Sequence, residues 1–246
     1  MASNIKYLLI DSKDRDNYTN TESHDISVVI KPAVNPPKRI CLKALSIPMT
    51  NYYINSTNNT IYFNSSSTSL SAQLNPGAYD YLTLGTEIKR VMEATAYSGT
   101  ITVTYDTDDF LFTIAGTVAY YFEWDLFDTN TFAPVLGYPN VSTAPAATSH
   151  TALYPSVLAI PQYFYIDIDQ FNHMLQSTDN SNHTFPIFIT ALKGDILLHF
   201  ENNNYNIDNI HGNHPIHKLD IKLQSRDNVA YNINNSDWSM LLELEY

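Results

Sequence analysis

Three histidines stand close together near the C-terminal end, at His211, His214 and His217. Imidazole groups in such numbers are typical zinc ligands. In a strand, His211 and His217 would share a face and His214 would point the other way. Gly212 and Pro215 oppose a helix, in which the three rings could converge only loosely. We therefore predict a surface loop that enters a strand and no metal site, and name the three histidines as the candidates if a loop gathers them.

Three carboxylates follow the first apolar segment, at Asp11, Asp14 and Asp16. A calcium loop needs acidic residues at alternate positions, a central glycine and a distal glutamate. This segment lacks both the spacing and the glycine. Lys13 and Arg15 can pair locally with the carboxylates, for little energy if they are exposed. The pattern indicates a solvated turn after a strand, with a conformational or interface role rather than a catalytic one.

Two further carboxylates, Asp167 and Asp169, stand two positions apart, so in a strand both project from one face. Paired carboxylates can act as the acid and base of a glycosidase. Ile166 and Ile168 occupy the other face, however, which is the ordinary composition of a half-exposed strand. The chain also lacks serine-hydrolase, phosphate-loop and cysteine–histidine signatures. We predict that it is not an enzyme and that it binds no cofactor.

Composition argues against other classes of function. The 246 residues include 13 Lys and Arg against 25 Asp and Glu, a formal net charge of −12. Nucleic-acid binding by counterion release needs clustered basic residues, so we expect no direct binding to nucleic acid. Cys41 is the one cysteine, which excludes an intrachain disulfide. Neither an apolar run of about 18 residues nor a secretory leader is present, so we expect no membrane span and no secretion.

The elements that must position these residues are mostly strands. Runs of β-branched and aromatic residues indicate the strands, and turn signals separate these runs. One segment, from Thr83 to Met92, repeats its apolar residues with helical spacing, and Asp80 or Thr83 can cap it. Residues 141–150 are small and polar and indicate a linker or exposed loop. The predicted strands are 7–10, 25–30, 40–47, 60–63, 100–105, 110–114, 163–169, 195–200, 217–223 and 238–244.

Many strands with one helix predict an all-β fold, a β-sandwich or single jelly roll with a small helix-plus-hairpin insertion. We treat residues 1–246 as a single jelly-roll domain, with an N-terminal strand and arm over 1–22. The stretch 57–140 has its own pattern of strand, turn, helix and hairpin. We interpret that stretch as a candidate α+β insertion within the domain.

A series of short motifs also follows a recognisable order along nearly the whole chain. They are Ile10-Asp-Ser-Lys-Asp-Arg-Asp16, Ser23-His-Asp-Ile-Ser-Val-Val-Ile30, Ile40-Cys-Leu-Lys-Ala-Leu-Ser-Ile-Pro48, Tyr52-Tyr-Ile-Asn55, Asn75-Pro-Gly-Ala-Tyr79, Val135-Leu-Gly-Tyr138 and Asn234-Asn-Ser-Asp-Trp-Ser-Met-Leu-Leu-Glu-Leu244. In this order they resemble the minor capsid (penton) proteins of virophages, Polinton-like elements and related large DNA viruses. The sequence departs from that family at Lys13, where arginine is commoner, and its insertion is short.

This resemblance implies a capsid protein that forms homopentamers at icosahedral vertices, beside a double jelly-roll major capsid protein. The protein would then lie in the virion, assembled inside the host cell. Tyrosine is enriched at protein interfaces, so exposed tyrosines become interface candidates, although half of them could lie in the core. The alternative function is a carbohydrate- or receptor-binding β-sandwich of a viral fibre or spike. The candidate assembly residues are Asp11, Asp14, Arg15, Tyr52, Tyr53, Tyr120 and Tyr121.

Overall fold

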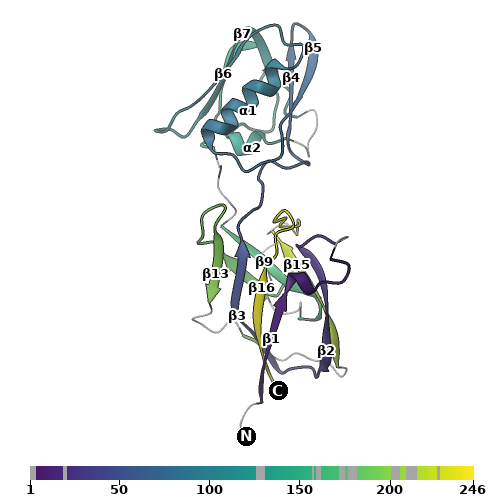
Figure 1. Cartoon of the computed structure of the whole chain (residues 1–246). Coiled ribbons are helices and arrows are strands. Elements are labelled where there is room, and N and C mark those ends of the chain that lie inside the picture. The colour runs from purple at the N-terminus through teal and green to yellow at the C-terminus, as the bar shows by residue number, and fades with distance from the viewer. Residues whose placement is uncertain are drawn as a thin grey trace. The chain divides into compact units, whose positions relative to one another are not determined.

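The structure is a computed structural model that describes residues 4–18, 21–125, 131–156, 158, 162–171, 175–176, 182–200, 206–208, 215–225 and 228–246. These residues form antiparallel sheets with little helix, which confirms the predicted all-β fold. The chain divides into two compact units (Figure 1). Unit 1 comprises Met1–Asn51 and Ile160–Tyr246, and unit 2 comprises Tyr52–Ala159.

Unit 1 is a sandwich of two antiparallel sheets. The first sheet contains, in order, β1 (Ile5–Asp11), β16 (Ser239–Glu245), β3 (Arg39–Pro48) and β13 (Ile196–Phe200), and β14 (Asn206–Asp208) also pairs with β3. The second contains β12 (Phe185–Phe188), β9 (Tyr163–Ile168), β15 (Ile216–Gln224) and β2 (Asp25–Val34). The short strands β10 (Leu175–Gln176) and β11 (Asn182–His183) pair with each other.

The order of these strands is that of a jelly roll. Without β14, these two sheets contain eight strands. If the eight are numbered from 1 to 8 along the chain, the first sheet has the order 1-8-3-6 and the second the order 5-4-7-2. Consecutive strands therefore cross between the two sheets, except for the fourth and fifth, β9 and β12, which pair with each other in the second sheet. This is the double Greek-key arrangement of a jelly roll. In the sequence, unit 2 falls between the third and fourth of these strands, β3 and β9.

The sandwich is held by alternating apolar residues. In β15, Leu219, Ile221 and Leu223 are buried while the residues between them stay partly exposed, as their spacing predicts. The ring of Phe164 stacks on that of Tyr231 in the same core, with centroids 4.7 Å apart. Each fully buried side chain of this size contributes roughly 1.5–3 kcal/mol.

Unit 2 is an antiparallel sheet packed against a helix and has a core of its own. The sheet contains, in order, β5 (Thr68–Gln73), β4 (Thr60–Ser65), β7 (Phe112–Phe122) and β6 (Ile101–Tyr105), and β8 (Ala147–Thr151) also pairs with β7. Figure 1 shows helix α1 (Tyr81–Glu93) across one side of these strands and the short α2 (Ala133–Leu136) below it. The predicted hairpin of β6 and β7 is confirmed.

The predicted helix is also confirmed, and it begins two residues before Thr83 because Asp80 caps it. The carboxylate of Asp80 accepts the Thr83 N–H at 2.7 Å, and the Thr83 hydroxyl accepts the Asp80 N–H at 3.0 Å, which completes a capping box. The apolar face of α1 is buried in the core of unit 2. Its buried residues are Leu84, Gly85, Ile88, Val91 and Met92.

One predicted loop is wrong. Residues 141–150 were expected to be a linker or exposed loop, but residues 147–150 belong to strand β8. The strand is anchored by His150, whose Nε2 lies 2.7 Å from the Tyr120 carbonyl oxygen in the core. Small polar residues around a single histidine show no apolar alternation, so the sequence could not predict this strand.

Candidate functional site

The structure describes one of the three candidate zinc-binding histidines, His217. His211 and His214 lie outside the described residues, and His217 is exposed on β15. Within the part of the chain that the structure describes, no group of three or more His, Cys, Asp or Glu side chains is placed to hold a metal ion.

The two carboxylates of β9 are in different environments. Asp167 is 1% exposed, and its oxygens lie 2.9 Å from the Nδ1 atom of His183 and 2.9 Å from the donating N–H of Thr184. Burial raises the pKa of Asp167, and the hydrogen bond with His183 opposes that rise. The ring of Tyr165 stacks on His183 at 3.6 Å. Asp169 is exposed because the strand ends at Ile168, so the two carboxylates do not form an acid–base pair.

The acidic turn after β1 is organised by Arg15. Asp11 caps the 3-10 turn Ser12–Asp14 by accepting the Lys13 N–H at 2.9 Å, whereas Asp14 is exposed. Arg15 is buried, and its guanidinium donates to the Ser12 carbonyl at 2.7 Å. The expected local pairing is therefore wrong for Arg15, whose ionic partner is the distant Asp237 at 3.1 Å.

Asp237 is the residue of this cluster that sequence reasoning missed. It also accepts a hydrogen bond from the Tyr18 hydroxyl at 3.0 Å, and the Tyr18 ring lies 4.0 Å from the Arg15 guanidinium carbon. Burial alone would raise the pKa of Asp237, but the hydrogen bonds from Arg15 and Tyr18 outweigh burial and lower the pKa. The cluster fixes the turn to the segment before β16, which is a structural role.

The candidate tyrosines have mixed exposure. Tyr120 is completely buried in unit 2 and donates its hydroxyl hydrogen to the Ile114 carbonyl at 2.7 Å, so the expectation of an exposed interface side chain is wrong for it. The reason is alternation along β7, which leaves its neighbour Tyr121 partly exposed. Tyr52 is 40% exposed, and Tyr53 is partly buried against the core of unit 2.

The first sheet of unit 1 presents an exposed apolar surface. Its outer strands β1 and β13 each present three exposed apolar side chains, from 45% to 71% exposed. Leu8 is partly buried against the core, and Ile10 and Leu197 are buried, so the exposed apolar side chains share the outward side of the sheet. We call this surface the outer face. It is defined by Ile5, Tyr7 and Leu9 of β1 and by Ile196, Leu198 and Phe200 of β13.

The central strands connect the two halves of the outer face. Leu9 pairs with Leu241, Leu241 pairs with Ala44, and Ala44 pairs with Phe200, so one apolar row crosses all four strands. Figure 1 shows β13, β3, β16 and β1 side by side in this sheet. Exposed apolar surface of this continuity is typical of an interaction site.

Ion pairs border the apolar row on β3 and β16. Lys43 lies 3.4 Å from Glu243, and Arg39 lies 3.3 Å from Glu245. Glu243 also accepts a hydrogen bond from the Tyr7 hydroxyl, and that bond is the main cause that raises the pKa of Tyr7. An apolar centre with a polar, internally neutralised border is the usual anatomy of a protein–protein interface.

No protein-family model matches the chain, and no curated protein matches it. Among solved structures it is similar to the crystal structure of the selenomethionine-labelled penton protein of mavirus, with a TM-score of 0.49 and 10% sequence identity over 98% of this chain and 99% of that one. In the described residues, no helix has the length and apolar character to cross a membrane.

Proposed function

We propose that this chain is a structural protein of a viral capsid and that its jelly-roll unit assembles through the outer face into pentameric vertices. The observation that carries the proposal is the apolar row from Leu9 to Phe200, which crosses four strands of one sheet. Its end residues are exposed in the isolated chain, and its central residues, Leu241 and Ala44, are partly exposed. Burying such a surface between copies removes apolar area from water, at about 25 cal/mol per Å².

The fold and the sequence support the same proposal. Jelly rolls occur in viral capsid and lectin domains, but a fold alone does not determine function. The ordered motifs of the sequence add the resemblance to penton proteins. With charged residues at only 15% and a net charge of −12, the chain is suited to a protein shell rather than to binding a genome. In this proposal the protein lies in the virion, next to double jelly-roll major capsid proteins.

The alternative function, sugar or receptor binding, usually relies on exposed aromatic rings. Both tryptophans of the sequence are buried, Trp124 at 0% and Trp238 at 3% exposure. The indole N–H of Trp238 donates to the Ser23 carbonyl at 2.7 Å, which gives it a structural role. Neither tryptophan can therefore stack on a sugar from the folded surface. Exposed tyrosines such as Tyr7 and Tyr154 could do so, and we favour assembly because of the apolar row of the outer face.

Native mass spectrometry and negative-stain imaging test the proposal. The variant carries Leu9→Lys and Leu198→Lys, which place charges on the outer face without touching the core. The matched control is Leu192→Lys, because Leu192 is 76% exposed and precedes β13 outside the sheet. We expect pentamers for the wild-type chain and the control, and an assembly midpoint concentration at least about tenfold higher for the variant.

Each experiment is run with and without a co-expressed double jelly-roll major capsid protein. A wild-type chain that stays monomeric in both cases and never enters particles would overturn the capsid proposal. Pentamers that form equally well with both lysines on the outer face would retain the capsid role but remove the outer face as its interface.

A further inference from the structure

Unit 2 contains a groove of about 390 Å³ between α1 and β6. On the helix side, Leu82 is 70% exposed and the Tyr81 ring stacks on that of Tyr105, with centroids 4.7 Å apart. Gly85 brings the helix close to the strand, since a Cβ at that position would lie 3.3 Å from the Val103 side chain. The groove is therefore lined mostly by apolar atoms and lies along an outer strand of the sheet.

The main-chain groups of β6 alternate between β7 and the groove side. The Thr100 carbonyl accepts the Thr117 N–H at 3.1 Å, and the Asp106 N–H donates to the Leu111 carbonyl at 2.9 Å. These two bonds lie at the two ends of the β6–β7 ladder, and both involve even-numbered positions next to β6. In an antiparallel ladder the intervening residues turn their N–H and C=O groups away from the partner strand. Ile101, Val103 and Tyr105 therefore direct these groups to the outer edge.

At the Ile101 end of this edge, side chains of α1 form hydrogen bonds with the main chain of β6. The Ile101 N–H donates to the Glu93 carboxylate at 2.8 Å, and the Ile101 carbonyl accepts from the Lys89 ammonium at 2.7 Å. Lys89 and Glu93 are paired with each other at 2.6 Å. Within the described part of the chain, Val103 and Tyr105 have no corresponding partners. The outward main-chain groups of Ile101 are therefore already hydrogen-bonded, whereas those of Val103 and Tyr105 are available to a further strand.

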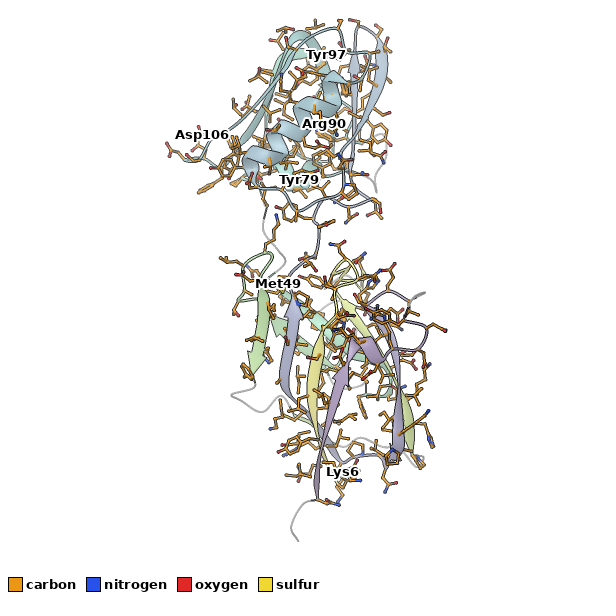
Figure 2. All side chains as sticks on the ribbon, in the orientation of Figure 1. Lys6, Met49, Tyr79, Arg90, Tyr97 and Asp106 are labelled. Atoms are coloured by element: carbon orange, nitrogen blue, oxygen red, sulfur yellow. The ribbon has the colours of Figure 1, made fainter. Side chains whose placement is uncertain are left out.

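The charge around the groove is acidic. The sequence of unit 2 contains nine Asp and Glu and two basic residues, Lys89 and Arg90. Arg90 is paired with Glu87 at 2.6 Å, as Lys89 is with Glu93, so both basic side chains are neutralised. Just beyond Tyr105, the turn after β6 exposes the carboxylates of Asp106, Asp108 and Asp109. Figure 2 labels Asp106 at this turn and Arg90 on α1.

We propose that this groove binds an extended, basic polypeptide segment of a partner protein, which adds to β6 as a further strand. Its main chain bonds to Val103 and Tyr105, an apolar side chain packs against Leu82, and lysine or arginine side chains face the acidic turn. Strand addition obtains affinity from main-chain hydrogen bonds and specificity from alternate side chains. This inference concerns unit 2 and does not depend on the proposed capsid function.

Fluorescence anisotropy with the full chain tests this inference, using a labelled hexapeptide of alternating lysine and valine. One control peptide has the same sequence with alternate main-chain nitrogens methylated, in either register, which removes the hydrogen-bond donors and keeps the charge. A second control replaces lysine by glutamate. We expect saturable binding of the first peptide, binding at least about tenfold weaker for the methylated peptides, and none for the acidic one.

Two variants locate the binding on the chain. Val103→Pro removes the outward N–H and is compatible with an outer strand. Leu82→Arg removes the apolar contact at an exposed position, and Leu153→Arg, at 65% exposure outside the groove, is its control for charge. Thermal unfolding confirms that each variant is folded. We expect at least about tenfold weaker binding for the first two variants and less than twofold change for the control.

Three results would overturn the inference. The first is no binding of the lysine–valine peptide at millimolar concentration, and the second is equal binding of the methylated peptides. The third is a dimer of the chain that Val103→Pro dissociates, which would show that the groove is occupied by a second copy rather than by a basic partner.

Discussion

The guanidinium of Arg15 lies 3.1 Å from the carboxylate of Asp237, although 222 residues separate them in the sequence. The arginine side chain is 3% exposed and the aspartate side chain 24%. The pair joins the turn after β1 to the residue that precedes Trp238, whose main-chain N–H donates to the Ser12 hydroxyl at 2.8 Å. Side-chain contacts therefore join the first and last strands of the jelly roll, in addition to the main-chain hydrogen bonds of their ladder.

Replacing Arg15 by alanine should destabilise unit 1 by roughly 2–4 kcal/mol, because it leaves the partly buried Asp237 without its cation. The control is Arg39→Ala, which removes a pair whose side chains are 40% and 30% exposed and should cost less than about 1 kcal/mol. Urea unfolding, followed by a probe specific to unit 1, measures both changes. Equal losses for the two variants would contradict the structural role of Arg15.

The same pair predicts an acid-sensitive component of stability. The pKa of Asp237 is lowered in the folded chain, so its contribution is present above the unfolded value of about 4 and is lost as pH falls towards the folded pKa. The stability difference between wild type and Arg15→Ala should therefore shrink as pH is lowered from 7 to about 3. Unfolding curves at several pH values measure that difference, and a constant difference would contradict the prediction.

Local structure could be predicted from the sequence where the apolar residues are periodic, because the period determines the type of element. The helix over α1 and the half-buried strand β15 both follow from apolar spacing. The pairing of β1 with β16 could not be predicted from residue patterns, because it joins the two ends of the chain. Only the resemblance to penton proteins indicated a jelly roll rather than another sandwich.

The candidate sites were harder to predict, and the reasons differ. Arg15 was expected to pair with its neighbours, since the sequence contains no sign that Asp237 would lie beside it. The outer face was missed because β1 is apolar on both sides, with Leu9 exposed and Ile10 buried. Alternation shows two faces in such a strand but does not show which one the second sheet covers. The groove of unit 2 depends on tertiary packing of α1 against β6.

A matched pair of glycines gives a third prediction. Gly137 and Gly194 both have positive φ, of 85° and 86°, so a side chain costs about 1 kcal/mol at either position. At Gly137 a Cβ would also lie 1.9 Å from the Tyr154 carbonyl oxygen, whereas at Gly194 it meets no atom within 4 Å. Gly137→Ala should therefore lower the melting temperature of unit 2 clearly more than Gly194→Ala lowers that of unit 1. Similar shifts in differential scanning calorimetry would contradict this.

The buried carboxylate of Asp167 gives the last prediction. Asp167→Ala removes the acceptor of the Thr184 N–H and the partner of His183, and should cost roughly 2–4 kcal/mol, whereas Asp167→Asn keeps an acceptor and should cost less. Because burial raises the pKa of Asp167, the folded chain binds its proton more tightly than the unfolded chain. The stability of the wild type relative to Asp167→Asn should therefore fall as pH rises from about 4 through the folded pKa. Urea unfolding across that range measures the slope, and a stability difference between the two chains that stays constant with pH would contradict the prediction.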